Sequence, residues 1–221
     1  MHRSVTYSQY VPALLLMTFA CGVLAQPGAS GGDDPSLRLL RTYLDEMSTL
    51  RAEFRQEVIS RDLERLEDTR GRVAFKKPGR FRWDYLEPFE RVISSDGERV
   101  WLYEADLEQV TIRRFDSGLG ATPAALLTGA TDILVHFRFV GARSEDSIRW
   151  LSLASRAPES DFAGIDLGFT DGELLQIFLT DRLGQQTRIT LSAIDRGADI
   201  DDAFFRFEVP PGVDVIDEDD I

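Results

Sequence analysis

Ten consecutive residues, Lys76 to Tyr85, combine four cationic side chains with three aromatic ones in the sequence KKPGRFRWDY. After the Pro-Gly pair, Phe81, Trp83 and Tyr85 occupy every second position, with charged residues between them. A β-strand alternates its side chains between two faces, so this spacing predicts one aromatic face and one charged face. The chemistry of such an aromatic face is noncovalent: it either packs into an ordinary core or binds an apolar ligand.

Patterns for covalent or metal chemistry are missing from the sequence. The single cysteine, Cys21, lies in the apolar N-terminal run, and neither a G-x-S-x-G nor an H-E-x-x-H motif occurs. His136 lies in the apolar pattern ILVHFRF, where we interpret it as a structural residue in the middle of a strand. We therefore expect no enzymatic activity, no metal site and no cofactor. An enzyme built on a lipocalin-like barrel is the alternative, and it would require buried polar groups that converge inside the fold.

The first 25 residues have the layout of a secretory signal peptide. Arg3 precedes an apolar run from Val11 to Ala25, and Val23-Leu24-Ala25 at its end offers small residues at the two positions that a signal peptidase reads. The run is about 15 residues long, whereas a membrane-spanning helix needs roughly 20. We expect cleavage after Ala25. An uncleaved membrane anchor and a lipid-modified Cys21 are the alternatives.

Charge and composition restrict the partners that the protein can have. The chain has a net charge of −13 and 43% hydrophobic residues. Neutralisation of phosphate charges supplies most of the affinity of proteins for nucleic acids, so we expect no nucleic-acid partner for so acidic a chain. Anionic lipid head groups also repel an acidic protein, so we expect it to leave a membrane surface easily. The length and composition predict a flexible leader at 26–35 and one domain at 36–221. We expect the protein to be a monomer.

One long amphipathic helix is predicted at the start of this domain. Asp34 followed by Pro35 is the arrangement of an N-cap and a first helical residue. Apolar residues then recur at helical spacing and form one stripe, which must cover an apolar surface elsewhere. The stripe consists of Leu37, Leu40, Leu44 and Met47.

After Leu50 the pattern changes to a period of two, which predicts about eleven strands in meander order. A short helix is predicted in the segment TPAALLTG, residues 122–129. A single antiparallel sheet of this size must curl or close on itself. The predicted fold class is therefore mainly β (α+β): a single curved, incompletely closed antiparallel β-barrel with a helical lid.

The strand ERVWLYE is apolar on both of its faces, because Val100 and Leu102 alternate with Trp101 and Tyr103. A sheet with water on one side should alternate apolar with polar residues. Since the predicted helices are too few to bury both faces, we expect an apolar cavity beneath them. A filled core with an aromatic rim is the alternative.

Several segments of the chain, in order, resemble the LolA family of outer-membrane lipoprotein carrier proteins. They are RAEFRQ, KKPGRFRWDYLEP, SDGERVWLYEADLEQV, TPAALL, TDRLGQQTRI and FRFEVPPGVDVI. The resemblance extends from about Leu37 to Ile216, and its second and third segments are the most specific. It implies an unclosed β-barrel whose helical lid encloses a hydrophobic cavity, and it implies a periplasmic carrier without a cofactor. The implied partners are acylated lipoproteins, an ABC-type release complex in the inner membrane and a receptor lipoprotein on the outer membrane.

The resemblance also implies a role for individual residues. Lys77 stands where the family commonly has an arginine that hydrogen-bonds the lid closed. Lysine keeps the charge but loses the planar fork of donors, so we expect a weaker latch, or one made to a single backbone carbonyl. The expected acyl-chain site, formed by lid and wall, comprises Leu40, Leu44, Met47, Phe81, Trp83, Trp101, Leu126 and Leu127.

Two relatives of the same fold offer alternative functions. A LolB-like outer-membrane lipoprotein receptor would keep a lipid anchor on Cys21, whereas a carrier would lose that residue with its signal peptide. Another periplasmic lipid-binding protein, such as a sensor of mislocalised lipoproteins, would need a signalling domain for which this chain has no room.

Overall fold

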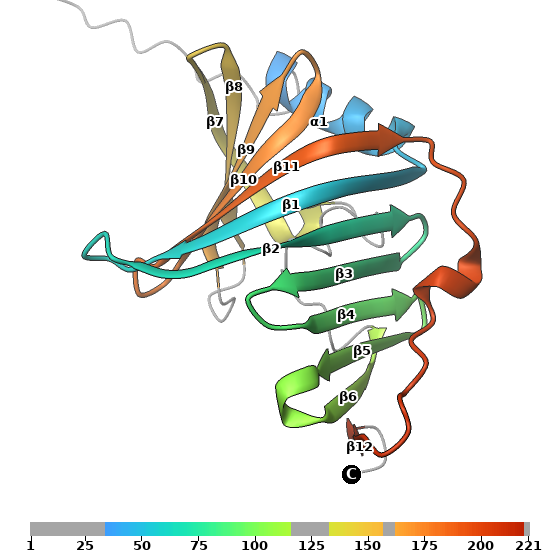
Figure 1. Cartoon of the computed structure of the whole chain (residues 1–221). Coiled ribbons are helices and arrows are strands. Elements are labelled where there is room, and N and C mark those ends of the chain that lie inside the picture. Colours follow the sequence, from blue (N-terminus) through green and yellow to red (C-terminus); the bar gives the residue numbers. More distant parts are fainter. Residues whose placement is uncertain (1–33, 116–132, 157–161, 219–221) are drawn as a thin grey trace, which may run out of the picture.

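A computed structural model describes residues 34–115, 133–156 and 162–218 of the chain (Figure 1). The predicted signal peptide, most of the predicted leader and the predicted lid helix with Leu126 and Leu127 lie outside the described residues. No helix in the described ranges is long and apolar enough to cross a membrane.

The described residues form strands with a few short helices. The strands are β1 (Thr49–Ile59), β2 (Arg65–Lys76), β3 (Arg80–Glu87), β4 (Arg91–Asp96), β5 (Arg99–Glu104), β6 (Gln109–Arg114), β7 (Phe137–Glu145), β8 (Ile148–Ser155), β9 (Phe162–Thr170), β10 (Glu173–Asp181), β11 (Gln186–Arg196) and β12 (Asp214–Asp217). The helices are α1 (Pro35–Glu46) and α4 (Ile133–His136), with 3-10 turns η1 (Ala105–Leu107) and η2 (Asp202–Phe205).

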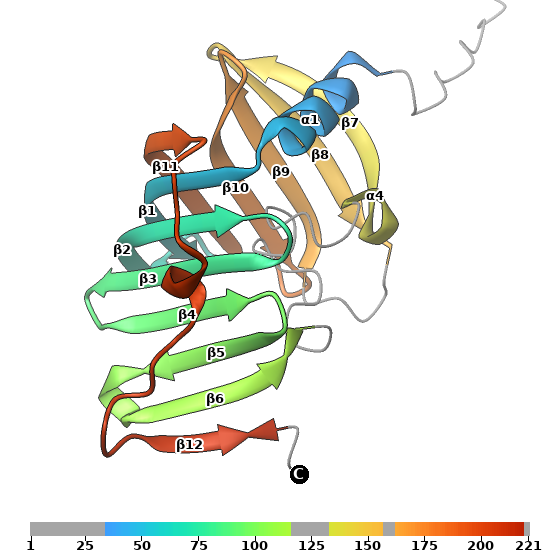
Figure 2. The ribbon, with the colours of Figure 1, turned by 90° about the vertical axis from the view of Figure 1, so that its right-hand side faces the viewer.

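All twelve strands belong to one sheet with the order β12-β6-β5-β4-β3-β2-β1-β11-β10-β9-β8-β7. Two meanders, β1 to β6 and β7 to β11, join where β1 pairs antiparallel with β11. The sheet curls strongly, and its outermost strands β7 and β12 do not pair with each other (Figures 1 and 2). The predicted incompletely closed barrel is therefore confirmed, except that its last strand, β12, pairs parallel with β6.

The alternation predicted for β3 is confirmed. Phe81, Trp83 and Tyr85 are buried, whereas the residues between them are partly exposed. Their side chains join a large apolar cluster that also contains residues of α1 and of β8 to β11. Because this cluster lies inside the curve of the sheet, we refer to its face as the concave face.

The outer face of strands β2 to β6 is covered by the segment after β11. Phe205 of this segment is fully buried against Ala74, and Phe207 packs beside Trp101 and Val110. Figure 2 shows the segment, coloured red, running across these strands toward β12. The second apolar face of ERVWLYE therefore packs beneath the C-terminal segment and does not require a cavity.

His136 is the last residue of the short helix α4, and β7 begins at Phe137. The prediction of a mid-strand histidine is therefore wrong. Apolar residues are consecutive from Ile133 to Val135, and a run this short cannot distinguish a helical period from a strand period.

Candidate functional site

Helix α1 lies across one end of strands β8 to β10 (Figure 2) and covers part of the concave face. Its predicted start is confirmed, since the Asp34 Oδ1 atom accepts a hydrogen bond of 2.8 Å from the Ser36 backbone N–H. Leu40 is almost fully buried and Leu44 is partly buried, while Met47 is buried just beyond the last helical residue. The apolar stripe thus faces the sheet.

Tyr43 also belongs to the buried side of α1, although the predicted apolar stripe does not include it. Its ring meets Phe169 of β9 edge-on, with 5.3 Å between the centroids. Burial, aided by the charge of Glu173, raises the pKa of Tyr43 to about 12. Tyr43 follows Leu40 by three residues, which is a helical spacing. Counting tyrosine with the apolar residues would therefore have placed it in the predicted stripe.

Aromatic rings cover the concave face of β1, β2 and β3. The Trp83 ring centroid lies 5.1 Å from that of Phe54, 6.0 Å from that of Phe75 and 6.5 Å from that of Tyr85. Phe81 lies on the same face and is 1% exposed. Phe54 and Phe75 were not among the predicted site residues, although each occupies a concave-face position of its strand.

Trp101 does not join this aromatic group. Antiparallel pairing places it opposite Ser94 and Ile112, on the outer face, while its neighbour Val100 belongs to the concave cluster. The prediction that Trp101 lines the same surface as Trp83 is therefore wrong. The local pattern could not decide the face, because both faces of this strand are apolar and covered.

Lys77 connects the turn after β2 with the end of α1. Its Nζ atom donates a hydrogen bond to the backbone carbonyl oxygen of Leu44, and its backbone N–H donates to the Ser48 carbonyl at 2.9 Å. The last carbonyls of a helix lack intrahelical donors and carry partial negative charge, which suits a lysine. Burial lowers the pKa of Lys77, and the nearby carboxylate of Asp45 opposes that effect.

The neighbouring Lys76 binds the C-terminal segment on the outer face of the sheet. Its Nζ atom donates to the Ile200 carbonyl at 2.6 Å and forms an ion pair with Asp202, also at 2.6 Å. Two adjacent lysines therefore bind segments on opposite faces of the sheet: Lys77 binds α1 on the concave face, and Lys76 binds the C-terminal segment on the outer face.

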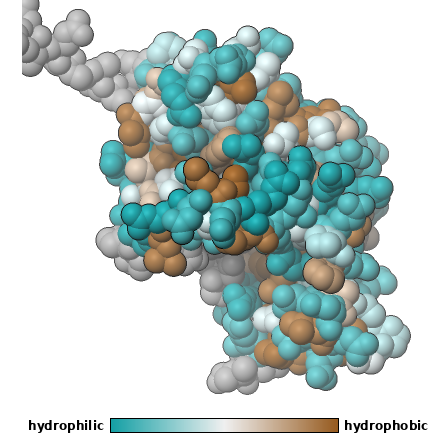
Figure 3. All heavy atoms as spheres, turned by 60° about the vertical axis from the view of Figure 1, so that its left-hand side comes forward, coloured by the Kyte–Doolittle hydropathy of each residue, from teal (hydrophilic) through white to brown (hydrophobic). Residues whose placement is uncertain are grey.

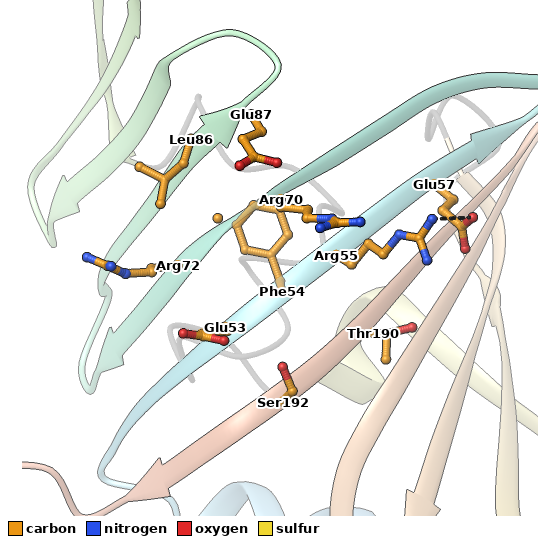
Figure 4. A pocket seen from close by; sticks show the side chains of 11 residues that line it. Glu53, Phe54, Arg55, Glu57, Arg70, Arg72, Leu86, Glu87, Thr190 and Ser192 are labelled. Carbon is orange, nitrogen blue, oxygen red and sulfur yellow. Dashed lines mark ion pairs between the residues drawn. The ribbon is translucent and has the colours of Figure 1, made fainter.

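A charged pocket of about 360 Å³ opens on the outer side of β1, β2 and β11 (Figure 4). Arg55, Arg72 and Glu53 surround it, and the ring of Phe54 lies beside Gly71 at its base. Charged groups that need water are poor neighbours for a hydrocarbon chain. This pocket is therefore not a candidate for acyl chains.

The turns that follow β1, β3 and β10 form a rim with exposed apolar side chains. Leu63, Phe89 and Leu183 are 81%, 71% and 82% exposed, and they lie in three different turns of this rim. A pocket of about 650 Å³ opens there between Phe89, Val58 and several carboxylates. Figure 3, which brings this end forward, shows separate apolar patches among polar groups.

Comparison with known proteins identifies the relatives of this chain. A family described as "Outer membrane lipoprotein carrier protein LolA" matches residues 45–208. The chain is 36% identical over 179 residues to an outer-membrane lipoprotein carrier protein of Dechloromonas aromatica, covering 81% of this chain and 86% of the relative. It is 33% identical over 208 residues to one of Chromobacterium violaceum, covering 94% and 98%.

Among solved structures, the fold is similar to that of an uncharacterized conserved protein from Thermus thermophilus, with a TM-score of 0.51 and 16% identity. That match covers 84% of this chain and all of the other protein, and it supports the fold alone. The unclosed sheet and the match over residues 45–208 lead to one conclusion: the chain belongs to the LolA family of outer membrane lipoprotein carrier proteins.

Proposed function

We propose that this protein carries lipoproteins through the periplasm and holds their acyl chains between the concave face and the helices that cover it. The observation that carries this proposal is the apolar concave face of an unclosed sheet, covered at one end by α1, in a chain of the carrier family. Curated relatives with the carrier name support it further, and none of the named relatives above is a receptor.

The energetics of lipid transfer explain why an apolar enclosure is needed. Removing an acyl chain from a membrane costs about 0.8 kcal/mol per methylene, so the carrier must offer a comparable apolar surface. The ring group around Trp83, with the buried leucines of α1, supplies such a surface. The surface has to be uncovered for cargo to enter, so α1 must be able to move.

Lys77 is the residue that we propose to control this movement. Its bond to Leu44 holds the last turn of α1 against the β2–β3 turn. A single ammonium group makes fewer hydrogen bonds than an arginine fork, which favours a latch that opens readily. Leu40, Leu44, Met47, Phe81 and Trp83 remain the proposed acyl-chain site, and Leu126 and Leu127 are proposed for the part of the lid outside the described residues.

The proposed partners are an ABC-type release complex in the inner membrane, which loads the carrier, and a receptor lipoprotein on the outer membrane, which unloads it. The exposed rim with Leu63, Phe89 and Leu183 is a surface that such partners can contact. This requires a periplasmic protein, which agrees with the predicted signal peptide at 1–25, leader at 26–35 and carrier domain at 36–221.

Release of lipoproteins from spheroplasts tests the function directly. The mature chain, residues 26–221, is incubated with spheroplasts, and the supernatant is assayed for lipoproteins bound to it. We expect bound lipoproteins with this chain and none with an equal concentration of an unrelated acidic protein. A folded chain that releases no lipoprotein would contradict the proposal.

The mass of the mature N-terminus separates the carrier from the receptor alternative. A carrier is expected to begin at Gln26, after loss of the only cysteine. An acylated Cys21 at the N-terminus would instead indicate a membrane-anchored receptor.

A further inference from the structure

We propose that the indole N–H of Trp83 hydrogen-bonds the carbonyl oxygen of an acyl chain, so that the site recognises the acyl linkage as well as the hydrocarbon. This inference rests on the proposed function, because it assigns a specific contact within the same site.

Trp83 points its ring into the concave cluster. Pairing places it between Val73 of β2 and Ile93 of β4, and its side chain is 4% exposed. The rings of Phe54, Phe75 and Tyr85 surround it, so most of its surroundings are carbon. Its Nε1 atom is buried and has no hydrogen-bond acceptor among the described residues.

An unpaired buried indole is an unusual feature. The indole nitrogen can only donate a hydrogen bond, and buried tryptophans normally find an acceptor. Leaving such a donor unpaired reduces stability, and a ligand that brings an acceptor recovers this loss on binding. Trp83 thus places a buried donor, without an acceptor among the described residues, in the wall where the cargo is proposed to lie.

The surroundings of Trp83 select the kind of acceptor. Two other polar groups on this face pair with each other, since the Tyr85 hydroxyl donates to the Gln56 Oε1 atom at 3.3 Å. The guanidinium carbon of Arg91 lies over the Tyr85 ring, 4.1 Å from the ring centroid. A neutral ester or amide carbonyl can accept from Trp83 without bringing a charge into the apolar face, whereas a free carboxylate would require an unpaired cation beside the indole.

The other two tryptophans offer internal controls. Trp101 lies on the outer face beneath the C-terminal segment, and Trp150 packs edge-on against Phe178, with 5.1 Å between ring centroids. Trp83 is the one tryptophan whose indole nitrogen is buried without a partner among the described residues. Substitutions at Trp83 and Trp101 therefore separate the proposed contact from a general effect of losing an indole.

A matched pair of lipids tests the proposal. The probes are 1-palmitoylglycerol and 1-O-hexadecylglycerol, which share a head group and a 16-carbon chain and differ in the acyl carbonyl. Their affinities are measured by displacement of a fluorescent fatty-acid probe from the mature chain. We expect the wild type and Trp101→Phe to favour the ester by about threefold to tenfold, the value of one neutral hydrogen bond.

Trp83→Phe keeps an aromatic ring but deletes the hydrogen-bond donor. This variant should therefore bind 1-palmitoylglycerol more weakly than the wild type does, bind 1-O-hexadecylglycerol equally well, and so show no preference for the ester. Equal binding of both lipids by the wild type would overturn the proposal and leave the carrier function intact. Binding of neither lipid would contradict the carrier function itself.

A spectroscopic measurement covers the case in which Trp83→Phe does not fold. In ¹H–¹⁵N spectra of the wild type, the Trp83 indole proton should move downfield on addition of the ester and stay in place with the ether. An indole signal that responds equally to both lipids would overturn the proposal.

Discussion

Replacing Lys77 with methionine removes the contact between the β2–β3 turn and α1 while keeping most of the side-chain volume. The Nζ atom of Lys77 donates to the Leu44 carbonyl, which lies in the last turn of α1 and otherwise has no intrahelical donor. We expect the last turn of α1 to open more often in Lys77→Met.

The expected increase in opening follows from the strength of the hydrogen bond between Lys77 and the Leu44 carbonyl. A hydrogen bond from a charged donor contributes about 1.5–3 kcal/mol when well protected. Lys77 is partly exposed, so water replaces part of the lost interaction, and about 1–2 kcal/mol is the expected loss. That loss corresponds to an increase of roughly fivefold to thirtyfold in the population of the open helix end.

Native-state hydrogen exchange measures the opening at single amides. The reporter is the Met47 amide, which bonds the Tyr43 carbonyl at 3.2 Å and is exposed only when the helix end opens. Its exchange rate should rise by the same factor, and Lys77→Arg, which keeps a donor, should show no rise.

Lys76→Met is the matched control, because the adjacent lysine binds Ile200 and Asp202 of the C-terminal segment. It should accelerate exchange in that segment and leave the Met47 amide unchanged. An exchange rate in Lys77→Met within twofold of wild type, or an equal rise in Lys76→Met, would refute the latch reasoning.

Three further substitutions test the packing. Gly71→Ala should lower the free energy of unfolding by about 3 kcal/mol or more, since its Cβ would lie 1.9 Å from the Asp84 carbonyl oxygen and 2.8 Å from the Phe54 ring; a loss below about 1 kcal/mol in urea unfolding would contradict this. Tyr43 has its pKa raised to about 12, so the stability it provides is complete below its unfolded pKa of about 10 and is lost as the pH rises toward 12. Wild type should therefore lose about 1.4 kcal/mol more than Tyr43→Phe between pH 7 and pH 11, and equal losses would exclude this titration. Phe205→Ala should cost about 3–5 kcal/mol because the ring is fully buried beneath the sheet's outer face; thermal unfolding that matches wild type would show that the C-terminal segment adds no stability.

Local features of the fold were predictable because neighbouring residues along the chain decide them. The cap at Asp34 and the start of α1 follow from a side-chain acceptor placed before a proline. The alternation of Phe81, Trp83 and Tyr85 follows from the pleat of any strand. The curled, unclosed sheet was expected from the number of strands, since so large a sheet must bend.

Features that depend on distant segments were not predictable in the same way. The four residues of α4 were too short to show a helical period, so His136 was placed in a strand. The helical spacing could have placed Tyr43 on the buried side of α1, but its edge-on contact with Phe169 of β9 depends on how the helix packs on the sheet.

The sequence by itself determined the strand periodicity, the N-terminal helix and the family, because these depend on residue types and short spacings. Tertiary structure alone decided that Trp83 faces inward and Trp101 outward, and that Lys76 and Lys77 bind opposite covers. The physical reason is that a strand presents two faces by its pleat, but only the segments that pack on each face, α1 and the C-terminal segment, determine which apolar residues join the concave cluster and which are covered on the outer face.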